Sequence, residues 1–286
     1  MAGMRDIKRR IRSIQSTQHI TKAMKTVSAA KLRKTQAKVI AARPYSDKLA
    51  EVLGRLLADV GQYEHPLLAT KEGNRVAYVV LTGERGFAGG YNTNVARLTE
   101  ATIKENPQED AVIIPVGRKG RDYFRRRGGN ILREYLDIGD DPHYIQAREL
   151  ARELAALFEQ GEVDKIYLVY TRFYSAIRHM PVVQQLLPVT AAPKEEEKAE
   201  EIEYLYEPMK EGVLDTLVPR YLEVQMYRAL LEAKTSEHGA RMTAMESASD
   251  NAAEMIDKLT LSFNRARQAA ITNEISEIVG GAAALN

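Results

Sequence analysis

The sequence lacks cysteine and several of the patterns that mark enzymes. Without cysteine the chain can form no disulfide, thiol nucleophile or Cys-ligated zinc site. Its five histidines, at positions 19, 65, 143, 179 and 238, have no metal-ligand spacing, and no Gly-x-Ser-x-Gly motif is present. No apolar run approaches the roughly 18 residues that would span a bilayer. We therefore expect a soluble chain with no visible active site.

Four glycines follow an apolar run in the segment LTGERGFAGGYN, residues 81–92. A strand that leads into a glycine-rich turn can hold a nucleotide. The spacing here is GxxGxxGG, which matches neither the dinucleotide fingerprint GxGxxG nor the Walker sequence GxxxxGK[ST]. We interpret the loop as a structural turn. A dinucleotide-binding enzyme stays an alternative, which ATP or NAD binding to residues 70–195 would support.

Charge is distributed unevenly along the chain. Residues 1–60 contain 14 Lys and Arg against 4 Asp and Glu, a net charge of +10, whereas residues 61–211 and 212–286 have net charges of −5 and −3. A basic arm of this kind meets nucleic acid, an anionic membrane surface or an acidic protein partner. A basic coiled-coil protein that binds nucleic acid is therefore a second alternative, and it predicts binding that weakens with salt.

The N-terminal segment has the apolar spacing of a long helix in a coiled coil. The predicted seam residues are Ile7, Ile11 and Ile14, then Ile20, Met24 and Val27, and finally Leu49, Val52 or Leu53, Leu56 and Val60. If the first register continued, the seam positions would be Gln18, Thr21, Lys25 and Ser28, so we expect the stripe to shift and weaken there. Pro44 is expected to kink or interrupt the helix, because it lacks an N–H donor.

The C-terminal segment shows the same spacing over a greater length. Its predicted seam is Ala252, Ile256, Leu259, Phe263, Ala266 and Ala270. At 1.5 Å per residue, helices over residues 4–58 and 212–280 would be about 80 and about 100 Å long. If they pair antiparallel from a common base, the second helix should extend roughly 20 Å further.

The middle of the chain alternates short apolar runs with polar helical stretches. Strands are predicted at 76–83, 111–117, 131–138, 165–173 and 182–189, and helices at 93–105, 118–127 and 142–160. This alternation predicts a mostly parallel sheet with helices on its faces. Pro181 is expected to separate the last two strands in a hairpin, and Asp140 and Asp141 to form a turn and helix cap.

Both ends of the chain resemble the gamma subunits of F-type ATP synthases. The opening MRDIKRRIRSIQSTQHITKAMKTVSAAKLRK is similar to the N-terminal helix of that family. The family's C-terminal signature is matched in full by Ile271, Thr272, Glu274, Glu277, Gly281 and Ala282. The segments GERGFAGGYN, GRKG, QLLP and YLYEP also match in the expected order. The resemblance therefore covers essentially the whole chain.

This resemblance implies an α/β chain in which the terminal helices form a long antiparallel coiled coil and a Rossmann-like α/β domain is inserted between them. The implied segments are an N-terminal helix (1–60), the α/β domain (70–195), a linker and foot (193–211) and a C-terminal helix (212–286). Within the family such a chain is a central rotor shaft, which couples proton-driven rotation of a membrane ring to ATP synthesis or hydrolysis at the beta subunits.

The resemblance also implies partners and contact residues. The partners are the alpha, beta and epsilon subunits and the c-ring, without cofactor or nucleic acid, at the cytoplasmic face of a bacterial plasma membrane and peripheral to it. The implied contacts with the beta-subunit catch are Arg267, Gln268, Thr272 and Glu274. Those with the beta-subunit lever are Lys22, Met24, Lys25 and Arg241. Tyr204 and Glu207 resemble the foot that meets the rotor ring and epsilon.

Overall fold

The computed structural model describes residues 4–59, 65–176, 178–190 and 209–284. The chain divides into two compact units. One comprises Met1–Ser28 with Arg241–Asn286, and the other comprises Ala29–Ala240. The long helices α1 (Met4–Asp59) and α5 (Lys210–Ala284) each contribute to both units. Tyr204 and Glu207, the predicted foot residues, lie outside the described residues.

The larger unit is built on a four-stranded mixed sheet of order β2-β1-β3-β4. Its strands are β1 (Arg75–Leu81), β2 (Asp110–Val116), β3 (Lys165–Phe173) and β4 (His179–Leu187). β1 pairs in parallel with β2 and with β3, and β4 pairs antiparallel with β3. The predicted mostly parallel sheet with a final hairpin is therefore confirmed.

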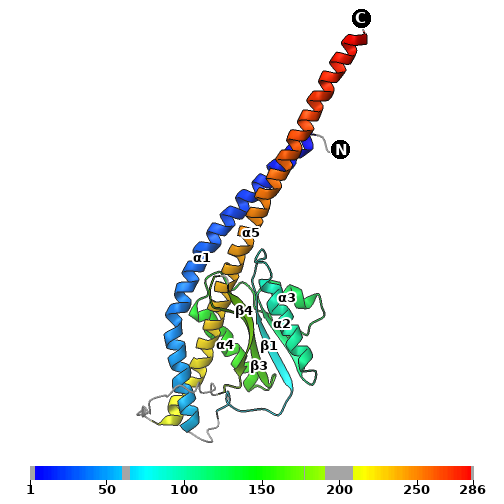
Figure 1. The fold of residues 1–286 in the computed structure, drawn as a ribbon. Helices are drawn as coiled ribbons and strands as arrows, with labels where there is room; N and C mark the ends of the chain where they lie inside the picture. Colours follow the sequence, from blue (N-terminus) through cyan, green and yellow to red (C-terminus); the bar gives the residue numbers. More distant parts are fainter. Residues whose placement is uncertain (1–3, 60–64, 177, 191–208, 285–286) are drawn as a thin grey trace. The chain divides into compact units, whose positions relative to one another are not determined.

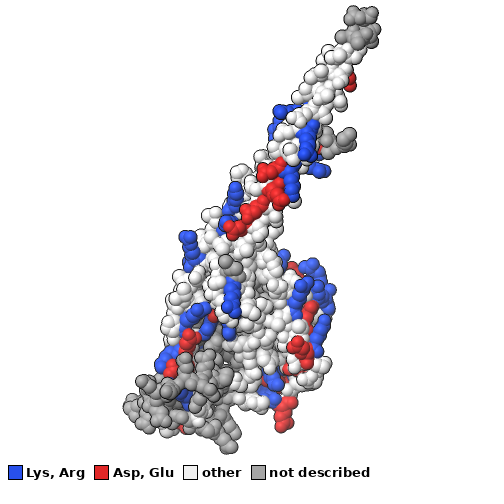
Figure 2. Space-filling view, in the orientation of Figure 1, with Lys and Arg blue, Asp and Glu red and all other residues white. Residues whose placement is uncertain are grey.

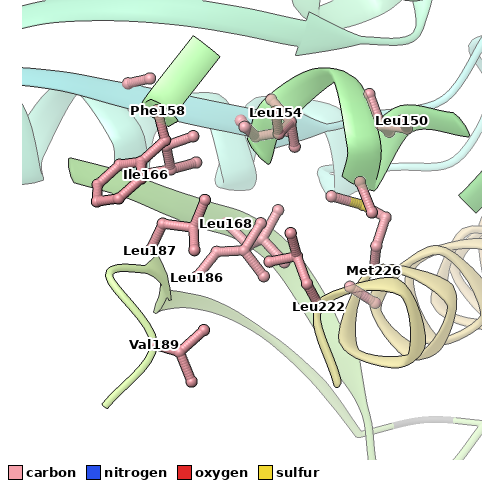
Figure 3. Close-up of a cluster of buried hydrophobic side chains, with 14 of the residues drawn as sticks. Leu150, Leu154, Phe158, Ile166, Leu168, Leu186, Leu187, Val189, Leu222 and Met226 are labelled. Atoms are coloured by element: carbon pink, nitrogen blue, oxygen red, sulfur yellow. The ribbon is translucent and has the colours of Figure 1, made fainter. Parts of the chain in front are cut away.

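Helices cover both faces of this sheet (Figure 1). α2 (Tyr91–Glu105) and α3 (Arg118–Arg125) pack on one face, where Tyr78, Val95 and Phe124 are buried together. α4 (Tyr144–Glu159) and parts of α1 and α5 pack on the other. Figure 3 shows side chains of α4, β3 and α5 meeting in this second core. Because both faces are covered, every residue of the central strand β1 after Arg75 is buried and none of them is charged.

Two of the predicted strand features are wrong. Residues 131–138 form only isolated bridges, Ile113–Ile131 and Val116–Tyr135, beside β2. Pro181 does not separate strands but lies within β4, paired with Thr171. Strand order explains why it is tolerated, because β4 is an edge strand and a residue without an N–H donor can occupy an edge.

The first terminal helix has the expected extent, and the second is a few residues longer than expected. α1 has 56 residues and continues through Pro44, so the predicted interruption is absent, and α5 has 75 residues and contains Pro219. At 1.5 Å per residue, their lengths are about 84 and about 112 Å. In the part of the chain that the structure describes, no helix is long and apolar enough to cross a membrane.

Candidate interaction surfaces of the terminal helices

In the smaller unit, α1 and α5 pair through a seam that keeps one register. Thr21 and Ser28 are buried, whereas Ile20 and Val27 are 58% and 53% exposed. The expected shift of the stripe to Ile20 and Val27 is therefore wrong. Along α1, inward-facing positions continue at spacings of four and three. The buried or half-buried residues at these spacings are Ile7, Ile11, Ile14, Gln18, Thr21, Lys25 and Ser28.

Hydrogen bonds explain how polar side chains occupy this seam. The hydroxyl oxygens of Thr21 and Ser249 lie 2.6 Å apart, and Gln18 Nε2 donates to the Ser249 carbonyl at 3.4 Å. Lys25 Nζ lies 2.6 Å from Glu246 Oε1. Later residues of α1 thus meet earlier residues of α5, which confirms antiparallel pairing. On α5 the predicted seam residues are all buried or half-buried: Ala252, Ile256, Leu259, Phe263, Ala266 and Ala270.

The four predicted lever residues differ in accessibility. Lys22 is exposed, Met24 and Lys25 are half-buried, and Arg241 is only 8% exposed. The structure brings Lys25 into the α1–α5 interface through its ion pair with Glu246. Sequence patterns did not indicate this pairing, because the two residues are 221 positions apart. Contact of these residues with another subunit stays a prediction.

Among the residues that the structure describes, no second helix lies beside the part of α5 that holds the four predicted catch residues. Extending the register of Thr21 and Ser249 places Met4 opposite about residue 266. Beyond it, Arg267, Gln268, Thr272 and Glu274 are all exposed. Helical spacing places Gln268 and Thr272 on one face and Arg267 and Glu274 on an adjoining face. Their role as a catch stays a prediction.

The end of α5 presents an apolar surface. Ile271, Ile275, Ile278 and Val279 are 47%, 56%, 71% and 61% exposed. Figure 1 shows this end continuing past the start of α1, and Figure 2 shows few charged side chains on it. An exposed helix end normally carries polar residues, so this surface is typical of one that another protein covers.

The first residues of the glycine-rich loop after β1 pack against α5. A Cβ at Gly83 would lie 2.8 Å from the carboxylate of Glu237 in α5, and Glu237 is 1% exposed. Tyr91, at the end of the loop, donates its hydroxyl hydrogen to the Ala233 carbonyl at 3.0 Å. The glycine therefore allows α5 to approach, which supports the interpretation of the loop as structural.

Glu84 in the same loop occupies the start of α3. Its carboxylate accepts hydrogen bonds from the backbone N–H groups of Arg118, at 3.3 Å, and Asp137, at 2.8 Å. Arg118 also donates its side-chain Nε–H to Glu84 at 3.0 Å. The first N–H groups of a helix are where a phosphate would bind. An internal carboxylate therefore takes the place of a bound anion.

Asp140 and Asp141 have a different role from the predicted helix cap. Residue His143 is the N-cap of α4, and the two aspartates instead form ion pairs with lysines of α1. Hydrogen bonds from Lys34 and Lys38 lower the pKa of Asp141. Burial alone would raise the pKa of Asp140, but Lys31, His238 and Lys234 together outweigh it and the net shift is downward. Sequence patterns missed these pairs, since about a hundred residues separate the partners.

Comparison with known proteins places the chain in a family. A family model described as ATP synthase matches residues 3–285. The ATP synthase gamma chain of Moorella thermoacetica is 62% identical over 285 residues, and that of Heliobacterium modesticaldum is 57% identical over 291 residues. Each alignment covers 100% of both proteins.

Solved structures agree on the fold. A chain in the Euglena gracilis mitochondrial ATP synthase, OSCP/F1/c-ring in rotational state 3, has a TM-score of 0.74 at 20% identity. The match covers 99% of this chain and 94% of that one. A rotor chain of the same enzyme in rotational state 1 has a TM-score of 0.68 and also 20% identity. The fold and the curated relatives lead to one conclusion, that the chain belongs to the family of ATP synthase gamma chains.

Proposed function

We propose that this chain is the central rotor shaft of a bacterial F-type ATP synthase and carries rotation between a proton-driven membrane ring and the beta subunits. One observation carries the proposal. Beyond the residue opposite Met4, α5 continues for about 18 residues, or about 27 Å, to its end at Ala284. A long helix that ends in exposed apolar side chains suits a bearing. Such a surface forms no fixed hydrogen bonds with the surrounding subunits, so the free energy of the turning shaft has no deep minimum at any one angle.

The shaft performs no catalysis in this proposal. The N–H groups at the start of α3 are bonded to the carboxylate of Glu84, and the carboxylate of Glu237 lies against Gly83. An anion at either of these points would meet a carboxylate. Isothermal calorimetry with the intact chain should therefore detect no ATP binding at physiological concentration. Micromolar binding would contradict this part of the proposal.

The proposed contacts with the beta subunits are argued from charge for α1 and from exposure for the end of α5. The basic α1 is complementary to acidic lever segments of beta subunits, with Lys22, Met24 and Lys25 of α1 and Arg241 of α5 as lever contacts. The exposed residues Arg267, Gln268, Thr272 and Glu274 are the catch contacts. A single exposed ion pair contributes only about 0.2–1 kcal/mol. Steric contact of a stiff helix is therefore the main means by which torque is transmitted.

The base of the shaft would meet the c-ring and the epsilon subunit, peripheral to the membrane on its cytoplasmic face. The segment boundaries 1–60, 70–195, 193–211 and 212–286 remain predictions.

Tyr204 and Glu207 are the proposed foot. The chain contains no cysteine, so single cysteines at 204 or 207 allow selective crosslinking to cysteines in the polar loop of the ring subunit. Rotation should persist after crosslinking, because both parts turn together. Failure to crosslink at several loop positions would contradict the foot.

Assembly is the direct test of the proposed function. The untagged chain should co-purify with tagged beta subunit when it is expressed with the alpha and beta subunits. The resulting complex should hydrolyse ATP, whereas the chain alone should not. A chain that stays free while alpha and beta subunits assemble would contradict the proposal.

A further inference from the structure

Three lysines of α1 converge on one bend of the larger unit. Lys31, Lys34 and Lys38 are three and four residues apart, so they lie on one face of the helix. Lys31 Nζ lies 2.5 Å from Asp140 Oδ2, and Lys34 Nζ lies 2.8 Å from Asp141 Oδ2. Lys38 pairs with the other oxygen of Asp141. Both oxygens of one carboxylate are thus held by lysines one helical turn apart.

The bend is fixed to the core of the unit on its other side. Pro142 is buried, and the His143 N–H donates to the side-chain oxygen of Gln146 at 3.0 Å, which caps α4. α4 then buries Leu150 and Leu154 against the sheet (Figure 3). A force on the aspartates is therefore passed to a packed helix and not to a loop.

The same bend also contacts α5. The carbonyl oxygen of Asp140 lies 3.3 Å from Nε2 of His238, whose side chain is 1% exposed. Lower on α1, a second set of contacts joins the two helices, since Arg228 of α5 donates to Ser46 at 2.9 Å and to Asp47 at 2.7 Å. The bend is thus one of the places where α1, α5 and the α/β core meet through polar groups.

We propose that Asp140 and Asp141 brace α1 against the α/β core and act as positioning residues that set the torsional stiffness of the rotor. The inference rests on the proposed function. Two carboxylates that bind three lysines along the helix oppose both sliding and rolling of α1, which a single ion pair would not. Each exposed pair is weak alone, but a network with shared partners resists displacement cooperatively.

Stiffness is measurable in single rotating complexes. Glu105 is exposed on α2, and Glu105→Cys gives the chain a single cysteine to which a bead can be attached. The beta subunits are fixed to a surface. During dwells at limiting ATP, the variance of the bead angle is inversely related to the stiffness of the rotor. We expect Asp140→Asn with Asp141→Asn to raise this variance about twofold, because the whole ion network is lost.

Matched variants separate the brace from a general loss of stability. Lys31→Gln, Lys34→Gln and Lys38→Gln together should produce the same increase from the other side of the network, and combining them with the two aspartate changes should add nothing further. Glu134→Gln removes the Arg125–Glu134 ion pair within the α/β domain and should leave the variance unchanged. The lysine variants also test the brace if the aspartate variant does not fold.

The possible outcomes are distinct. If the unmodified chain assembles and rotates but both sets of variants keep its angular variance, the brace is wrong and the proposed function stands. An increase that is additive between the two sets, or that Glu134→Gln reproduces, also overturns the brace. A complex that hydrolyses ATP while the unmodified chain does not rotate contradicts the proposed function itself.

Discussion

Thr21 of α1 and Ser249 of α5 share a buried hydrogen bond of 2.6 Å between their hydroxyl groups. Replacing Thr21 with Val keeps the shape but leaves the Ser249 hydroxyl without this partner. We expect the free energy of unfolding to fall by about 1–3 kcal/mol, the cost of an unsatisfied buried polar group. Adding Ser249→Ala should recover part of the loss. Thermal and urea unfolding of the chain measure both effects.

Thr26 provides the control for this prediction, because it is exposed on the same helix. Thr26→Val should change the free energy of unfolding by less than about 0.5 kcal/mol. Equal effects of the two threonine substitutions would contradict the role of the buried pair in the seam.

Gly83 is predicted to tolerate no side chain. A Cβ there would lie 2.8 Å from Oε1 and 2.9 Å from Cδ of the buried Glu237. Gly83→Ala should therefore destabilise the chain by about 1–3 kcal/mol through overpacking. Gly54→Ala is the control, since no atom lies within 4 Å of its added Cβ, and within a helix it should stabilise by about 0.5–1 kcal/mol. Thermal unfolding that places both variants at the same midpoint would contradict the close packing.

The general fold could be predicted because its signals are local. Periodic apolar residues predicted the two long helices, and apolar runs bounded by turns predicted β1, β2, β3 and β4. Residues 131–138 were misassigned because they resemble a strand locally but pair with β2 only at Ile131 and Tyr135. Pro44 did not interrupt α1, since a helix supported by tertiary packing can keep a residue that lowers its intrinsic stability.

The contacts between distant segments could not be predicted from spacing. The apolar pattern predicted a seam through Ile20 and Val27, but the real seam runs through Thr21. Its hydrogen bond with Ser249 offsets the cost of burying the two hydroxyl groups, and hydrophobicity alone does not predict that bond. Asp140 and Asp141 read locally as turn residues, and their lysine partners become neighbours only after folding. The exposure of Arg267, Gln268, Thr272 and Glu274 agrees with the prediction that the C-terminal helix extends beyond the N-terminal helix.

The aspartate brace predicts a specific dependence of stability on pH. Both aspartates have folded-state pKa values below their ordinary values, so their stabilisation is fully present above the unfolded pKa of about 4 and is lost as pH falls through the lower folded values. The groups that face them are Lys31, Lys34, Lys38, Lys234 and His238. The stability difference between the unmodified chain and Asp140→Asn with Asp141→Asn should therefore shrink below about pH 4. Unfolding curves in which the difference widens in acid would contradict this.

The end of α5 should contribute less to turnover than the catch residues below it. Deleting residues 279–286 removes apolar surface and should weaken assembly modestly while ATP-driven rotation persists. Gln268→Leu with Thr272→Val removes exposed polar groups and should lower turnover more than the deletion does. Steady-state hydrolysis by intact complexes decides the matter. If the deletion abolishes ATP hydrolysis while the double substitution has no effect, the end of α5 and not Gln268 and Thr272 is the catch.

Rotation of the chain relative to the beta subunits is the most direct test of its role as a shaft. Complexes are fixed through their beta subunits, and a bead is attached to Glu105→Cys in a chain that otherwise contains no cysteine. On addition of ATP, the bead should turn stepwise in one direction, and it should stop when ATP is removed. Complexes that contain the chain and hydrolyse ATP at an undiminished rate while the bead stays still would contradict the account.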